Sequence, residues 1–331
     1  MTNTTAYNFI KLNELYSHPL EIDWLIEDII PNNSVGMIYG ASGSGKSHII
    51  LIMAAMIANG LPWFDKETKE GNVLVMAGEG LSGLSRRLRA IELEHNIAIN
   101  QDRIHVSNRA IGLDTADGYK LVEQAINELE TPPQAIFIDT LSRHLMESEE
   151  NSNDDMARFI GRLDGIRLKY ECTIILVHHT GKAAGQGARG ASALRSNVDF
   201  SFEVEGKDKM CALSCDKMKD ADDAIPKINF SIKPVDLGVT SSRGKPITGA
   251  CVVKADRPFN LTVSRKGNDE IALECFNEDG RIWPSAYVDS CTADIADDSK
   301  KRQFRKARAD LISEGKVKEN SDGSYSLAQC D

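Results

Sequence analysis

Closely spaced glycines that lead into a lysine and a serine limit what this chain can fold into more than any other feature. The stretch reads Gly40-Ala41-Ser42-Gly43-Ser44-Gly45-Lys46-Ser47, which has the spacing G-x-x-x-x-G-K-S. A short apolar segment, residues 35–39, comes before it, and an apolar segment with helical spacing, residues 48–58, comes after it. Glycines at these positions let the backbone curl until several N–H groups point at one anion, and the positive end of the helix adds to the attraction. The sequence therefore predicts a phosphate-binding loop between a strand and a helix.

This loop is best assigned to a nucleotide. A glycine-serine turn without a ligand is the alternative, but strand, motif and helix follow one another in the order that a nucleotide site requires. In that arrangement Lys46 reaches the β- and γ-phosphates of ATP, and the hydroxyl of Ser47 binds Mg²⁺. We expect the loop's ATP contacts to come from Gly40, Ala41, Ser42, Gly43, Ser44, Gly45, Lys46, Ser47 and His48.

The composition excludes several classes of protein. Of the 331 residues, 41% are hydrophobic, which is enough for a large core, and the net charge of −10 argues against a surface coated in basic residues for nucleic acid. The seven cysteines form no C-x-x-C pair, so we expect reduced thiols, a cytoplasmic location and no zinc site. The N-terminus has no export signal, and the longest apolar run, residues 49–58, is far shorter than the roughly 20 residues that cross a bilayer. We therefore expect no contact with membranes.

Strand-like and helix-like segments alternate between about residues 35 and 205. Such alternation predicts an α/β fold with a mainly parallel central sheet and helices on its faces. From about residue 210 to 253 the pattern becomes rich in strands, which predicts antiparallel strands at the edge of the sheet, with loops or a hairpin at 238–246 and 254–269. The expected strands are 35–39, 73–76, 103–107, 135–138 and 173–178, and the expected helices are 48–58, 82–95, 115–129 and 154–170.

The C-terminal part is predicted to be a separate α+β module that resembles the end of a winged helix. Phe304, Ala307 and Leu311 recur at helical spacing on a basic stretch, and Asp322-Gly323 lies at the centre of a predicted hairpin, residues 317–327. Two readings of the basic helix stay open: contact with nucleic acid, duplex included, or a solvated helix that packs on a neighbour. The nucleic-acid candidates are Lys301, Arg302 and Arg305. The expected division is an N-terminal arm (1–30), the nucleotide domain (31–255), a β-rich connection (256–281) and the C-terminal module (282–331).

Two carboxylates are candidates for the chemistry of ATP hydrolysis. Asp139 ends the apolar run 135–138, so it lies at the carboxyl end of a buried strand, where it would hold Mg²⁺ together with Ser47. Glu79 follows the strand 73–76 between two glycines that let the backbone turn, so it is the candidate for orienting the attacking water. The alternatives are a turn cap for Asp139 and a plain loop acid for Glu79.

Several basic or titratable residues are candidates for sensing phosphate and for binding DNA. His178 and His179 end the strand 173–178, and either of them could hydrogen-bond the γ-phosphate. Residues 178–198 contain no acidic side chain, which favours a basic loop that contacts single-stranded DNA over a loop that is simply mobile. The DNA candidates in this loop are Lys182, Arg189 and Arg195.

Lys217 and Lys219 lie on one face of an expected strand. Their ammonium groups could stabilise the charge on a phosphate that is bound by a neighbouring subunit. A solvated strand face is the other interpretation of this pair.

These residues together resemble the RepA-type hexameric helicases with a RecA fold, which plasmids, phages and mobile elements carry, and more distantly the DnaB-like helicases. The resemblance covers about residues 20–250 and implies a RecA-like P-loop NTPase core, a hexameric ring, Mg²⁺-ATP bound between subunits, single-stranded DNA in the channel and a finger residue supplied in trans. It also implies a place near ATP for Arg87 and a replication initiator or primase as partner. The residues that carry it are 40–47, 77–80 with Gly83, Leu84, Arg87 and Leu88, 138–141, 149–151, 178–182 and 189–192.

One position departs from the family pattern. Asp199 stands where some RepA-type helicases carry an arginine finger, so Lys217, Lys219 or Arg189 is the expected finger here. The sequence thus predicts an ATP-hydrolysing DNA helicase or translocase of mobile-element replication. Two alternatives stay open: a RecA/RadA-like recombination or annealing ATPase, and an ATP-switched protein that binds an origin or loads a helicase.

Overall fold

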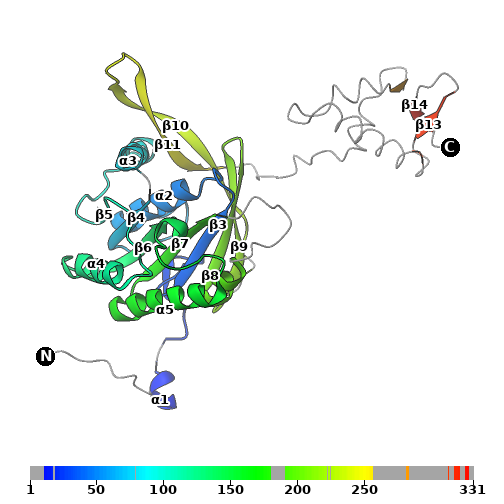
Figure 1. Cartoon of the computed structure of the whole chain (residues 1–331). Helices are drawn as coiled ribbons and strands as arrows, with labels where there is room; N and C mark the ends of the chain where they lie inside the picture. The colour runs from blue at the N-terminus through cyan, green and yellow to red at the C-terminus, as the bar shows by residue number, and fades with distance from the viewer. Residues whose placement is uncertain are drawn as a thin grey trace. The chain divides into compact units, whose positions relative to one another are not determined.

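The structure, a computed structural model, divides the chain into two compact units, Met1–Phe259 and Asn260–Asp331, and each is described here by itself (Figure 1). In the first unit it describes residues 11–17, 19–78, 80–179, 191–221, 223 and 225–255. In the second it describes residues 281–282, 312, 317–320 and 325–327.

A nine-stranded sheet forms the centre of the first unit, with the order β11-β10-β9-β8-β3-β7-β6-β4-β5 (Figure 1). Its parallel part confirms the predicted α/β fold class. The strand that enters the glycine-rich loop, β3, lies between β7 and β8, and β7 separates it from β6. The parallel strands are β3 (Val35–Gly40), β4 (Asn72–Ala77), β5 (Ile104–Val106), β6 (Pro133–Asp139), β7 (Thr173–His179) and β8 (Phe200–Lys207).

Antiparallel strands extend one edge of this sheet, as the sequence predicts for residues 210–253. They are β9 (Met210–Met218), β10 (Ile228–Thr240) and β11 (Pro246–Lys254). The strand β10 runs further than expected, because it stays paired with β11 across an irregularity between Asp236 and Val239. The predicted hairpin is thus present with its turn at 241–245, whereas the second predicted loop, 254–269, lies outside the described residues from 256 onward.

Helices cover both faces of the parallel sheet (Figure 1). The side chains of Ile38, Phe137 and Val177 form a buried cluster with α2 and α3, and those of Met37 and Ile138 form a second cluster with α4 and α5. Successive side chains of a strand point to opposite faces, so these clusters define which strand residues face which helices. The four helices are α2 (Lys46–Asn59), α3 (Leu81–His95), α4 (Ala116–Asn127) and α5 (Asn153–Tyr170).

The helix after the glycine-rich loop, α2, is apolar on all sides because it is enclosed on all sides. Eleven of its residues are buried, and it packs against the parallel strands and against β11. The antiparallel strands also reach its first turn: a Cβ at Gly45 would lie 3.0 Å from Ile232 Cδ1 and 3.3 Å from Cys211 Sγ. The antiparallel extension therefore closes over the loop as well as widening the sheet.

Short elements complete the description. The first unit also contains α1 (Leu12–Leu15), β1 (Trp24–Ile26), β2 (Ile30–Pro31), the 3-10 turn η1 (Leu141–Arg143) and α6 (Ala191–Asn197). Among the described residues, no helix has the length and apolar character needed to cross a membrane.

The second unit contains a three-stranded antiparallel sheet. The predicted hairpin strands are β13 (Val317–Glu319) and β14 (Tyr325–Leu327), which pair with each other, and β12 (Arg281–Ile282) adds to β14. The centre of the predicted turn, Asp322-Gly323, and the predicted basic helix with Lys301, Arg302 and Arg305 lie outside the described residues. The winged-helix assignment stays a prediction.

Candidate functional site

The glycine-rich loop joins β3 to α2, as predicted, and its glycines are required by its geometry. Gly45 precedes the first turn of α2 with φ of 101°, a left-handed conformation that costs glycine little. A Cβ at Gly40 would lie 2.2 Å from the carbonyl oxygen of Val204 in β8. Gly206, further along β8, is similarly close, since a Cβ there would lie 2.6 Å from the carbonyl oxygen of Ser44. The neighbouring strand thus supports the loop by backbone contact.

Lys46 is buried inside this loop. Its side chain is 3% exposed, and Nζ donates to the carbonyl oxygens of Gly40 at 2.9 Å and Ala41 at 2.7 Å. Burial lowers the pKa of Lys46 to about 8, although the negative charge of Asp139 opposes this shift. A polyanion bound at the loop would favour the charged ammonium and would offer it stronger acceptors than two neutral carbonyls.

Asp139 lies at the carboxyl end of β6 and on the same face of the sheet as α2. Its side chain is 9% exposed, and with Leu51 and Arg87 it lines a cavity of about 10 Å³ between the sheet, α2 and α3. Its negative charge opposes the lowering of the Lys46 pKa. The structure thus places Asp139 and Arg87 at one cavity, and β6 carries Asp139 to the same edge of the sheet as the glycine-rich loop.

The donor set at this edge suits Mg²⁺. Ser47 follows Lys46 in the first turn of α2, so a hydroxyl and the Asp139 carboxylate offer hard oxygen ligands on one side of the sheet. No cluster of three or more His, Cys, Asp or Glu side chains that could hold a metal occurs in the part of the chain that the structure describes. Mg²⁺ needs no such cluster when it is bound by one carboxylate, one hydroxyl, water and the phosphates of a nucleotide.

The two candidate histidines lie on opposite faces of the sheet. In the pairing of β3 with β7, Gly40 lies opposite His179, and alternation puts His179 on the face of Val177 and α2. His178 points to the α5 face, is 4% exposed, and donates from Nδ1 to Glu150 Oε1 at 3.0 Å. Of the two, His179 is therefore the one that is placed on the side of the phosphate loop.

Lys217, Lys219 and Arg195 lie away from this loop, at the junction of α6, β8 and β9. Lys217 Nζ donates to the carbonyl oxygen of Arg195, in the last turn of α6, at 2.9 Å. It also donates to the carbonyl oxygen of Val198, just after α6, at 2.6 Å. Burial lowers the pKa of Lys217 against the opposing charge of Asp199. Arg195 Nη2 pairs with Asp216 at 2.6 Å, and Lys219 Nζ pairs with Asp199 Oδ1 at 3.4 Å. Within one copy these cations contact their own chain and take no part in the cluster around Lys46.

Glu79, Lys182 and Arg189 lie outside the described residues, so their predicted roles stay predictions. The residue before Glu79 is described: the N–H of Gly78 donates to the carbonyl oxygen of Asp139 at 2.6 Å. The carboxyl ends of β4 and β6 are therefore joined at the point where the chain continues into Glu79.

The sequence analysis missed two contributions to this region. The contacts of Val204 and Gly206 with the loop are made through the backbone, and no side-chain motif announces them. Glu150 was noticed only as part of the family resemblance, and its partner His178 is distant in the chain. One sequence signal for the pair of Glu150 and His178 was available. A carboxylate follows shortly after the strand that ends at Asp139, and histidines end the next strand.

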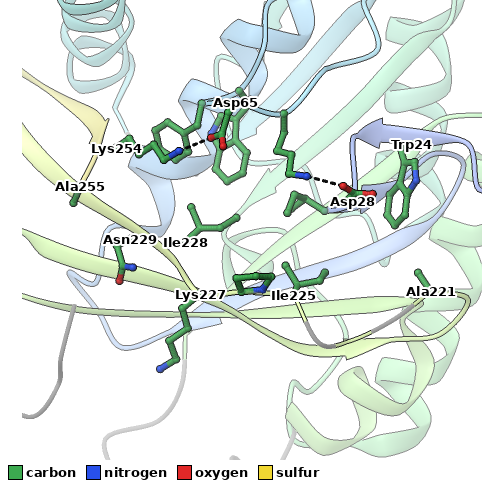
Figure 2. Close-up of a pocket in the computed structure, with 15 residues that line it drawn as sticks. Trp24, Asp28, Asp65, Ala221, Ile225, Lys227, Ile228, Asn229, Lys254 and Ala255 are labelled. Carbon is green, nitrogen blue, oxygen red and sulfur yellow. Dashed lines mark hydrogen bonds and ion pairs between the residues drawn. The ribbon is translucent and has the colours of Figure 1, made fainter. Parts of the chain in front are cut away.

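The described part of the chain also contains a larger cavity that is lined by no residue of the glycine-rich loop. It has a volume of about 510 Å³ and lies beyond the C-terminal end of α2, where Trp24, Trp63 and Ile228 are among the residues that line it (Figure 2). Two ion pairs cross its rim: Lys66 with Asp28 and Lys254 with Asp65, each at 2.6 Å (Figure 2).

The match to a protein-family model agrees with the nucleotide assignment. A protein-family model described as "AAA domain" matches residues 4–185, which is 182 of the 331 residues. Among solved structures, the chain is similar to one titled "ATPase Domain of G40P", with 11% sequence identity and a TM-score of 0.47 over 66% of this chain and 91% of that one.

Proposed function

Because the chain belongs to the AAA domain family, we propose that it hydrolyses Mg²⁺-ATP at the glycine-rich loop and uses the energy to move along single-stranded DNA. In this proposal the protein is a hexameric helicase or translocase of RepA type. It acts in the replication of a plasmid, phage or other mobile element, with a replication initiator or primase as partner.

The observation that carries the ATPase part is the position of Lys46, Asp139 and His179 on one face and one edge of the sheet. Lys46 would bind the β- and γ-phosphates, and Ser47 with Asp139 would hold Mg²⁺. The metal ion, when bound, would neutralise charge that develops on the phosphate oxygens. His179 would hydrogen-bond the γ-phosphate from β7, and Glu79 would orient the attacking water from the end of β4.

The DNA and ring parts of the proposal rest on the sequence resemblance. Lys182, Arg189 and Arg195 supply positive charge in a segment without acidic residues, which suits a DNA backbone. In a ring, Lys217 or Lys219 would leave its contacts with Val198 or Asp199 and approach the nucleotide of the adjacent subunit. A cation supplied in trans makes hydrolysis dependent on assembly.

We expect ATP hydrolysis to rise when single-stranded DNA is added, together with assembly into closed rings. The measurements are phosphate release with and without DNA, and native mass and electron microscopy with a non-hydrolysable ATP analogue. Filaments on DNA would instead favour a RecA/RadA-like recombination ATPase. A monomer that binds duplex DNA with sequence preference and without ATP would favour the origin-binding alternative.

We expect affinity for a non-hydrolysable ATP analogue to fall as the pH rises above about 8, the pKa of Lys46. Phosphate charge raises the pKa of Lys46 in the complex, so binding takes up a proton above pH 8 and none well below it. The affinity is therefore full below the pKa of the free protein and falls at most about tenfold per pH unit above it. Calorimetric titrations from about pH 7 to about pH 9.5 would measure this. In Lys46→Ala the decline should be absent, and an equal decline in that variant would assign it to another group.

A further inference from the structure

One carboxylate from another element fastens the middle of the loop that follows Asp139. Asp114, just before α4, accepts backbone N–H groups of three consecutive loop residues. The distances to Oδ2 are 3.0 Å for Met146, 2.7 Å for Glu147 and 2.6 Å for Ser148, and Met146 also donates to Oδ1 at 2.9 Å. The carbonyl oxygen of His144 accepts from Leu113 N at 2.9 Å, which adds a backbone link at the same place.

This use of Asp114 goes beyond helix capping. The N-cap of α4 is Thr115, whose Oγ1 accepts from Gly118 N, so the carboxylate of Asp114 is not needed to satisfy the helix. Asp114 is 4% exposed; burial alone would raise its pKa, but the N–H groups of Met146, Glu147 and Ser148 hold the pKa below its usual value. A buried carboxylate with several backbone donors is a strong and directional anchor.

The far end of the same loop reaches β7. Glu150 Oε1 accepts from His178 Nδ1 at 3.0 Å, and this hydrogen bond, opposed by burial, keeps the pKa of Glu150 below its usual value. His178 is the neighbour of His179 in β7, and the two side chains point to opposite faces of the sheet. Glu150 therefore holds the carboxyl end of β7 from the face opposite to the phosphate loop.

We infer that Asp114 and Glu150 are positioning residues for the ATPase site. Asp114 holds the loop after Asp139 in its shape. Glu150, at the end of that loop, fixes His178 and, through the backbone of β7, His179. This inference rests on the proposed function. Neither residue lies on the face of the glycine-rich loop, since their contacts are on the α4 and α5 face. They act on the position of His179 relative to Gly40, its partner in the pairing of β3 with β7.

Glu150→Ala tests the link to β7. We expect kcat for ATP hydrolysis to fall about tenfold while the Kd of a non-hydrolysable analogue changes less than about twofold, because only the alignment of the histidine is lost. Glu150→Gln keeps an oxygen that accepts from His178 and should restore most of the rate. Glu149→Ala, an exposed neighbour, is the matched control and should behave as wild type.

A double-mutant cycle and hydrogen exchange separate this inference from the proposed function. If Glu150 acts through His179, then Glu150→Ala should cost little further in a His179→Ala background. Independently of activity, Asp114→Asn should speed amide exchange at residues 146–148 and at 178–179. Unchanged exchange at 178–179, or additive losses in the cycle, would overturn the inference. A wild-type protein that does not hydrolyse ATP would overturn the proposed function, while the exchange experiment could still support the positioning of β7.

Discussion

Lys46→Ala is expected to lower ATP turnover by about 10²–10³-fold, the range seen when one preorganised donor to a developing negative charge is removed. In the structure this ammonium is held at the centre of the loop by the carbonyl oxygens of Gly40 and Ala41. It is positioned before any substrate arrives, and its burial makes the interaction with phosphate strong. Phosphate release at saturating Mg²⁺-ATP measures the effect.

The matched control for Lys46→Ala is Lys69→Ala. Lys69 pairs with Asp23 at 2.7 Å on the surface, and such exposed pairs contribute about 0–1 kcal/mol to stability. Lys69→Ala should unfold at nearly the wild-type temperature. Lys46→Ala removes a buried charge but also takes a neighbouring cation from Asp139, so its unfolding temperature is measured beside its turnover. Wild-type turnover in Lys46→Ala would mean that the glycine-rich loop is not the site of hydrolysis.

Much of the fold follows from local patterns in the sequence. Apolar runs bounded by polar residues predicted β3, β4, β6 and β7. A parallel sheet also predicts that residues at strand ends meet at one edge, which is why Asp139 and the histidine pair were assigned to the site of Lys46. These inferences need no knowledge of strand order.

Other features depend on contacts between distant parts of the chain. The choice between His178 and His179 needs the register of β7 against β3, since adjacent residues of a strand are equivalent until one face is known. The sequence leaves Lys217 either on a solvated strand face or as a finger in trans. Only the structure shows that, within one copy, it donates to carbonyl oxygens at the end of α6, where a cation is favoured. The sequence gives no sign of the role of Asp114, because its hydrogen-bond partners are backbone groups about 30 positions away in the chain.

Asp139→Asn is expected to raise the Mg²⁺ concentration needed for hydrolysis and to lower turnover at fixed Mg²⁺ by about 10²-fold, as for loss of one charged group at a phosphoryl-transfer site. Asparagine has nearly the same shape, so the end of β6 should stay intact while one negative ligand is lost. Titrations of ATP hydrolysis with Mg²⁺ measure both changes. Asp102→Asn, the same exchange at an exposed aspartate, is the control and should keep the wild-type Mg²⁺ dependence.

A second readout of Asp139→Asn needs no metal. The charge of Asp139 raises the pKa of Lys46 against the effect of burial, so its removal should lower that pKa further. The decline of affinity for metal-free ATP analogue with rising pH should then begin below about pH 8, whereas Asp102→Asn should leave it at the wild-type pH. If Asp139 were only a turn cap, the Mg²⁺ requirement would not move. A shift in the pH profile alone would keep Asp139 beside Lys46 and assign the metal to other ligands.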